Sequence, residues 1–310
     1  MITLGLLPML GGILLASASS PDEQTAASAV SNRSSGRAAP VEPSDVWQTL
    51  HFRGWNLLAR FSAELEIELP ERGLPPSGKG RLEWVAELRT SLDSRFLSDK
   101  SSRLRAYFDP ISGVVRRLTQ LSMGPRPDFK RYEFGSRGAT RIRSEPSPGD
   151  PLESPESWPG GLESFHGYDA EALGCRLVSN PAALAWWLTW GPAATTVLPE
   201  DPRACYFLGK TLYRVDVKPL GTRTARVDYR LVREGRSRRR QGRVRLERFA
   251  AVSRPIAGKL DEKTIVAEIA LDAENRLPWR FVMRDGPLGI DVQLEQADLR
   301  EPSLVPADGP

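Results

Sequence analysis

The sequence predicts a mainly β protein whose curved antiparallel sheet forms a barrel or half-barrel with one short Trp-rich helix. Three observations favour this class. Apolar and polar residues alternate with a period of two in many short runs, turn-forming residues separate these runs, and only one segment has a helical pattern. Because strands do not alternate with helices as they would around a parallel sheet, we expect an antiparallel sheet that curls on itself.

The first series of strands is expected to begin near Asp45. Its clearest run covers residues 61–69, where apolar side chains alternate with Ser62, Glu64, Glu66 and Glu68. Such alternation is typical of a strand with one face in water, so these glutamates are expected to form a charged, solvated face. Similar runs occur at residues 82–88, 104–108, 114–121, 129–134 and 139–143.

A segment at residues 144–172 interrupts this pattern and predicts a long acidic, proline-rich loop. It has five prolines and seven acidic residues, and it contains no Lys or Arg. His166 lies near Glu163 and Asp169 in this segment, but a solvated loop histidine is a better interpretation than an acid-base pair.

The segment after this loop predicts the helix. Asn180 suits the N-cap and Pro181 the first helical position, and the helix is expected to extend to Thr189. Three tryptophans accompany it, namely Trp186, Trp187 and Trp190. They could line an apolar ligand pocket or, as the more common role, form a plug that fills the barrel.

The second series of strands is more regular. Its runs cover residues 213–217, 225–231, 244–246, 265–271, 277–284 and 290–294. Turns are expected at residues 219–222, which contain Pro219 and Gly221, and at residues 234–242, which are bounded by glycine.

The N-terminal residues predict export. Residues 2–18 are apolar and nearly uncharged, and they end in Ala16-Ser17-Ala18, a pattern that suits signal peptidase. A membrane anchor is the alternative, but the run is short and contains Pro8 and two glycines. We therefore expect a signal peptide at residues 1–18, a flexible segment at 19–44, one β domain at 45–300 and a flexible tail at 301–310, in a protein of the periplasm or cell envelope.

The two cysteines, Cys175 and Cys205, are a candidate disulfide, because export would expose them to oxidising conditions. Closing such a loop would contribute about 3 to 3.5 kcal/mol. Two unrelated buried thiols are the alternative. His51 and His166 are isolated from other potential ligands in the sequence, so no metal or other cofactor is expected.

A run of arginines at residues 223–248 predicts a cationic hairpin. It has eleven arginines against three acidic residues, whereas the whole chain has a net charge of only +4. Alternation places Arg226, Arg230, Arg243 and Arg245 on its outer surface. Lipid phosphates, acidic glycans or the chain's own acidic segment could pair with them, or they could form only a solvated face. Nucleic acid is not expected, because aromatic residues do not lie among the arginines.

Three segments resemble a family of exported bacterial proteins known as domain of unknown function 3108. They are Tyr107-Phe-Asp-Pro-Ile-Ser-Gly-Val114, the helix-like segment 182–190, and Leu271-Asp-Ala-Glu-Asn-Arg-Leu-Pro278 with the strand at Gly289-Ile290. The resemblance covers residues 55–299. It implies a fold similar to the half-barrels of lipoprotein carriers, in which a curved sheet and a helical lid enclose an apolar cavity.

No catalytic motif is found. Gly135-Ser136-Arg137-Gly138 lacks the spacing and the context of a nucleophile elbow, and no phosphate-binding loop follows a strand. The sequence therefore predicts a non-enzymatic envelope protein of unknown activity that binds a lipid-like or amphiphilic ligand. A structural or protein-interaction module without ligand is the alternative, and an envelope hydrolase ranks last. The oligomeric state stays open.

Overall fold

The computed structural model describes residues 46–55, 59–68, 84–94, 100–109, 114–147, 149, 154–159, 161–175, 177–179, 204–208, 210–258, 260, 264–283 and 290–300. The expected signal peptide, N-terminal segment and C-terminal tail lie outside these residues, as do the expected helix and its tryptophans. Among the described residues, no helix is long and apolar enough to cross a membrane.

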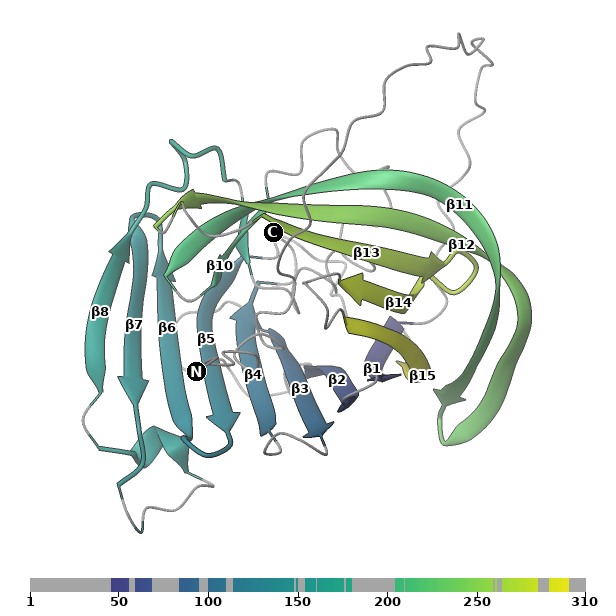
Figure 1. The fold of residues 1–310 in the computed structure, drawn as a ribbon, viewed down its shortest axis with the longest axis horizontal. Helices are drawn as coiled ribbons and strands as arrows, with labels where there is room; N and C mark the ends of the chain where they lie inside the picture. Colours follow the sequence, from purple (N-terminus) through teal and green to yellow (C-terminus); the bar gives the residue numbers. More distant parts are fainter. Residues whose placement is uncertain are drawn as a thin grey trace, which may run out of the picture.

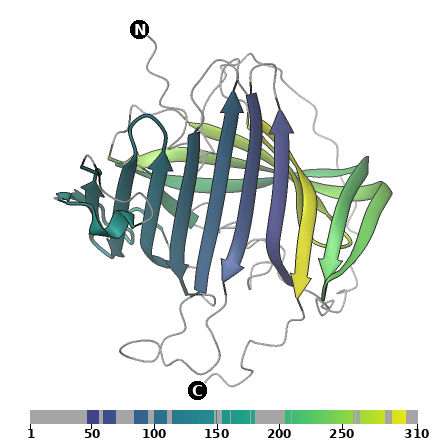
Figure 2. The same cartoon turned by 90° about the horizontal axis from the view of Figure 1, so that it is seen from below.

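The described residues form one 15-stranded, almost entirely antiparallel sheet, which confirms the predicted fold class (Figure 1). The strands of its first half are β1 (Val46–Trp55), β2 (Ala59–Glu68), β3 (Trp84–Ser94), β4 (Lys100–Phe108), β5 (Val115–Met123), β6 (Asp128–Gly135), β7 (Gly138–Ser144) and β8 (Leu162–Gly167). They lie side by side in chain order, as the view from below shows (Figure 2).

The second half returns to the first through its last strand. Its strands are β9 (Leu177–Ser179), β10 (Ala204–Leu208), β11 (Thr211–Arg233), β12 (Arg236–Ala257), β13 (Ile265–Asp272), β14 (Leu277–Met283) and β15 (Ile290–Arg300). β15 pairs with β1, and its end also pairs in parallel with the end of β11. Because β11 to β15 already lie side by side, this pairing closes them into a ring.

The longest elements, β11 and β12, form one hairpin that arches over the rest of the sheet (Figure 1). The turn expected at residues 219–222 was wrong, because β11 continues through this segment with only a register irregularity between Pro219 and Gly221. Gly221 has φ +83°, a conformation that glycine adopts readily, and the irregularity lets the strand bend without ending.

The turn expected at residues 234–242 was too long. Only Glu234 and Gly235 connect the strands, with φ of 49° and 75°, and Arg233 pairs directly with Arg236. Positive φ at both central residues is typical of a type I′ hairpin turn. Residues 236–242 form a strand although they are polar, because backbone pairing with β11 does not require an apolar side.

The loop expected at residues 144–172 also needs correction. It contains a short 3-10 helix, η1 (Pro155–Ser157), and the edge strand β8, which pairs with β7. β8 is mostly exposed, so it lacks the apolar alternation from which strands are predicted. His166 lies in β8 and is half-buried, so its interpretation as a solvated loop histidine was wrong. Burial, together with the charges of Arg141 and Lys210, lowers its pKa.

The main core lies between the first half of the sheet and the hairpin. One apolar cluster joins Leu50 and Leu65 of the first strands to Val227 and Leu246 of the hairpin. A second, smaller cluster surrounds Tyr206 and Tyr213, whose rings stack 5.2 Å apart. The apolar face of the sheet therefore points inward, and we call the opposite face the outer face.

Candidate functional site

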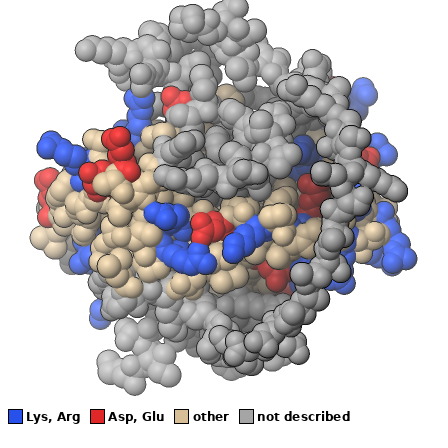
Figure 3. All heavy atoms as spheres, turned by 90° about the horizontal axis from the view of Figure 1, so that it is seen from above, with Lys and Arg blue, Asp and Glu red and all other residues tan. Residues whose placement is uncertain are grey.

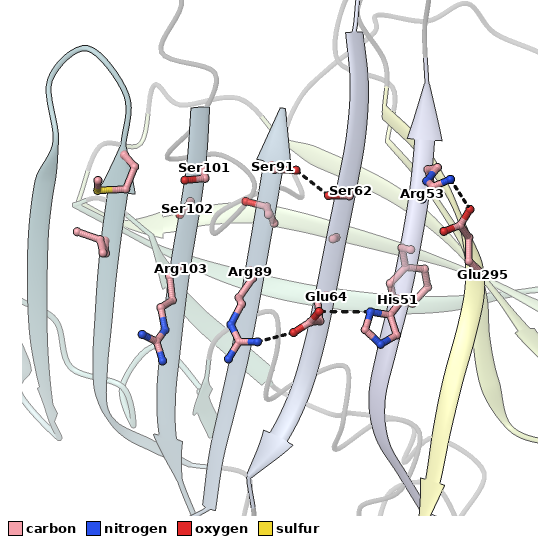
Figure 4. Close-up of a pocket in the computed structure, with 15 residues that line it drawn as sticks. His51, Arg53, Ser62, Glu64, Arg89, Ser91, Ser101, Ser102, Arg103 and Glu295 are labelled. Atoms are coloured by element: carbon pink, nitrogen blue, oxygen red, sulfur yellow. Dashed lines mark hydrogen bonds and ion pairs between the residues drawn. The ribbon is translucent and has the colours of Figure 1, made fainter. Parts of the chain in front are cut away.

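A groove of about 470 Å³ lies on the outer face of β15 and of β1 to β5 and is open to solvent (Figure 4). Its lining side chains from this face are His51, Arg53, Ser62, Glu64, Glu295, Arg89, Ser91, Ser101, Arg103, Leu121 and Met123. We call this hollow the serine groove, because three serines form its base. Sequence reasoning assigned the glutamates to a solvated face but did not find the groove.

The base of the groove follows from strand register. Ser62 of β2 lies opposite Ser91 of β3, and Ser91 lies opposite Ser101 of β4. The hydroxyl oxygens of Ser62 and Ser91 are 2.7 Å apart and share a hydrogen bond. Because larger side chains flank these small ones on the same face, the row of serines forms a depression.

One side of the serine groove is a network of charged residues held by a buried carboxylate. Glu87 has no exposed surface. Its carboxylate forms ion pairs with Arg89 at 2.5 Å, with Arg103 at 2.8 Å and with Arg105 at 2.9 Å. Arg89 also donates to Glu64 at 2.5 Å. A buried carboxylate is tolerated only when it is paired, and these shared contacts fix the guanidinium groups in place.

His51 continues this network on β1. Its Nδ1 lies 3.3 Å from Glu64 and its Nε2 lies 3.6 Å from Asp298, so each ring nitrogen faces a carboxylate. No described serine contacts the ring. The groove therefore brings polar groups together, and the serine–histidine contact that is typical of a serine hydrolase is not formed among its described residues.

The hairpin places its four predicted arginines as the sequence suggested. Arg226, Arg230, Arg243 and Arg245 are exposed, whereas the intervening Val227, Tyr229 and Val244 are buried. Arg226 lies directly opposite Arg243 in the strand register. Among the described residues, no carboxylate forms an ion pair with any of these four arginines. We call them the arginine face.

Other arginines of the hairpin do have partners. Arg239 donates two hydrogen bonds to Asp228, and these lower the pKa of that carboxyl group. Arg240 contacts Glu274, and Arg248 lies 3.1 Å from Glu268. In the view from above, Lys and Arg side chains lie at both edges and near the centre of this face, and several of them lie at the right-hand edge (Figure 3).

The chain's own acidic segment does not cover the arginine face in the described structure. Its strand β8 and the turn of the hairpin lie at opposite ends of the molecule (Figure 1). Its described ion pair joins Glu145 to Arg143 of the neighbouring strand, not to the hairpin. The expected pairing within the chain is therefore not formed by the residues that the structure describes.

The inward face of β3 to β5 carries buried polar groups. Thr90 lies opposite Ser102, which lies opposite Ser122, and Gln120 is in the adjacent row. Thr90, Ser102 and Gln120 are each at most 5% exposed, yet both hydroxyls and the Gln120 amide nitrogen lack a hydrogen bond. Unpaired buried polar groups are rare in folded proteins.

The two cysteines are joined. Cys175 and Cys205 form a disulfide with a Cα–Cα distance of 5.7 Å, as expected from the sequence. It connects the turn after β8 to β10, where Cys205 is fully buried. No cluster of three His, Cys, Asp or Glu side chains that could hold a metal occurs in the described part of the chain.

Fold and surface together define a β-barrel-like protein with a polar outer groove and a cationic hairpin. The chain is similar to the crystal structure of a β-barrel-like protein of domain of unknown function 1849 from Brucella abortus. The similarity has 7% identity and a TM-score of 0.42, and it covers 82% of this chain and 96% of that one. No family model and no curated protein matches the sequence.

Proposed function

We propose that this chain is a non-enzymatic exported protein that docks onto anionic phospholipid head groups through its arginine face. The observation that supports this most is the direct opposition of Arg226 and Arg243 on an exposed surface. Arg230 and Arg245 extend the same surface, so four guanidinium groups face solvent together.

In the free protein, the arginine face holds like charges close together. Like charges directly opposite each other in a sheet are destabilising. Asp228 lies close enough to Arg226 for the two charges to interact, but it is hydrogen-bonded to Arg239 and forms no ion pair with Arg226 or Arg243. An anionic surface would relieve the repulsion, and guanidinium groups form paired hydrogen bonds with phosphate oxygens. A lipid surface suits the arginine face better than a small anion, since the four side chains extend along two strands.

The compartment belongs to the same proposal. The apolar leader that ends in Ala16-Ser17-Ala18 supports export to the periplasm or envelope, and the Cys175–Cys205 disulfide is compatible with oxidising surroundings. Membership of domain of unknown function 3108 remains a proposal that rests on the three sequence segments.

Binding to vesicles tests the docking proposal. We would measure cosedimentation of the protein with vesicles of phosphatidylglycerol and phosphatidylcholine, and with vesicles of phosphatidylcholine alone. Each arginine near an anionic surface contributes roughly 1 kcal/mol, so replacing all four by Gln should weaken binding by roughly a thousandfold at low salt. The wild-type protein should bind only the anionic vesicles.

A matched variant controls for net charge. Arg60, Arg126, Arg131 and Arg137 are also exposed but lie on other strands and turns, and replacing them by Gln removes the same charge. This control should retain most of the vesicle binding. Equal loss in both variants, at unchanged thermal midpoints, would mean that the arginine face has no special role.

A second candidate function is binding of an amphiphile on the inward face, for which the unpaired groups of Thr90, Ser102 and Gln120 are the specific support. Leu88 and Leu104 lie opposite each other in the next row on the same face, so apolar and polar side chains adjoin there. Native mass spectrometry of protein purified from its own envelope would test this. A copurifying lipid supports the function, and repeated preparations without one favour a structural or interaction module with a filled interior.

A further inference from the structure

The serine groove has a balance of charge that does not suit an ionic ligand. Each of the three arginines that line it is paired with a carboxylate: Arg53 with Glu295 at 3.1 Å, Arg89 with Glu64, and Arg103 with Glu87, which lies buried beneath the groove. Every one of these positive charges therefore already has a negative partner. Neither an anion nor a cation would therefore gain a large electrostatic benefit there.

The groove nevertheless offers many directional polar groups. The hydroxyls of Ser62, Ser91 and Ser101 can each donate and accept, and the carboxylates of Glu64 and Glu295 accept. Arg103 uses its Nε and one terminal nitrogen to bind Glu87, which leaves its other terminal nitrogen without a described partner. The ligand that fits such a surface carries several neutral groups that both donate and accept hydrogen bonds.

An exposed aromatic side chain lies on the same outer face. Trp55 is 71% exposed and follows Arg53 by two residues on β1, so both side chains lie on one face of the strand. The exposed indole offers a large apolar surface, and covering it with a ligand would remove that surface from water. The negative face of an indole attracts polarised C–H groups, which the apolar face of a sugar ring presents.

We propose that the serine groove and Trp55 form a binding site for a neutral saccharide, with the sugar hydroxyls in the groove and one ring against the indole. The network around buried Glu87 holds the polar wall in place before the ligand binds, which reduces the ordering cost of binding. This site is independent of the arginine face and lies on different strands.

Saturation-transfer NMR with the full-length mature protein tests the site. The probes are three neutral oligosaccharides, maltotriose, cellotriose and chitotriose, and one anionic oligosaccharide, trigalacturonic acid. We expect at least one neutral trisaccharide to bind, and to bind more tightly than trigalacturonic acid. Absence of binding by all three neutral probes, or preference for the anionic one, would overturn the proposal.

Variants locate the binding. Trp55→Ala removes the exposed ring, and Ser91→Leu fills the centre of the groove, so each should weaken binding by about tenfold or more. Ser237→Leu, on the exposed surface of β12, is the matched control and should bind normally. If Ser91→Leu lowers the thermal midpoint, Ser101→Leu replaces it at the exposed end of the serine row.

The outcome is separable from the lipid proposal. Trp55→Ala should leave binding to anionic vesicles unchanged, and the arginine-face variant should leave saccharide binding unchanged. Saccharide binding that survives both Trp55→Ala and the groove-filling variant would place the ligand elsewhere and contradict the assignment.

Discussion

At the residue scale, Tyr229 and Asp272 connect the cationic hairpin to the turn between β13 and β14. The Tyr229 hydroxyl donates to Asp272 at 2.7 Å, and Asn275 donates to the Tyr229 hydroxyl at 3.2 Å. Asp272 is fully buried and also accepts from the backbone N–H of Glu274. The segment Leu271–Pro278 is thus more than a common turn, because its acidic residue anchors the hairpin from inside.

Replacing Tyr229 by Phe should lower the free energy of unfolding by about 1.5 to 3 kcal/mol, the usual range for a hydrogen bond to a charged group. The Phe ring would pack as the Tyr ring does. The stability would be lost because the buried carboxylate of Asp272 would no longer accept a hydrogen bond from the hydroxyl. Urea unfolding at neutral pH measures this. Tyr107→Phe is the control, since the Tyr107 ring lies beneath Arg117 on the polar face, and it should change stability much less.

At the element scale, a strand could be predicted from the sequence only where apolar and polar residues alternate along it. β2 was predicted within two residues, because its apolar face is buried and its other face is polar. β8 and the first half of β12 were missed, since backbone pairing on an exposed surface leaves no apolar pattern. The outward direction of the four hairpin arginines was correct because Val227, Tyr229 and Val244 supply that pattern between them.

Two substitutions in the turn of the hairpin should change the stability of the protein in opposite directions. Gly235 has φ +75° and nothing within 4 Å of the position that a Cβ would take, so Gly235→Ala should cost about 1 to 2 kcal/mol from backbone strain alone. Glu234→Asn should be stabilising, because Asn-Gly is the preferred type I′ pair. Hydrogen exchange at residues 233–236 should become faster in the first variant and slower in the second.

At the scale of the whole molecule, β15 joins both halves of the sheet by pairing with β1, β14 and the end of β11. Strand order of this kind cannot be obtained from periodicity, because residues of distant segments become neighbours. For the same reason the serine row and the contacts of Glu87 were not predicted. Only after register is known do Ser62, Ser91 and Ser101 become one surface.

Buried tyrosines predict loss of stability at high pH. Burial raises the pKa of Tyr132 and Tyr168 to about 12, and burial raises those of Tyr206 and Tyr229 further. In the unfolded chain these groups titrate near pH 10. Their raised pKa therefore contributes stability that is complete below about pH 10 and is lost as pH rises toward the folded values. Thermal midpoints measured from pH 8 to 12 should fall above pH 10, whereas a flat profile would contradict this account.

The most direct test of the central claim, that the arginine face docks onto anionic lipid, is a reversal of charge. Arg226, Arg230, Arg243 and Arg245 would all be replaced by Glu, and cosedimentation would be measured with phosphatidylglycerol vesicles and with vesicles of a cationic lipid. Because the effect of the face depends on the sign of its charge, the variant should lose binding to the anionic vesicles and gain binding to the cationic ones. A variant that keeps its fold and still binds phosphatidylglycerol vesicles as the wild-type protein does would contradict the claim.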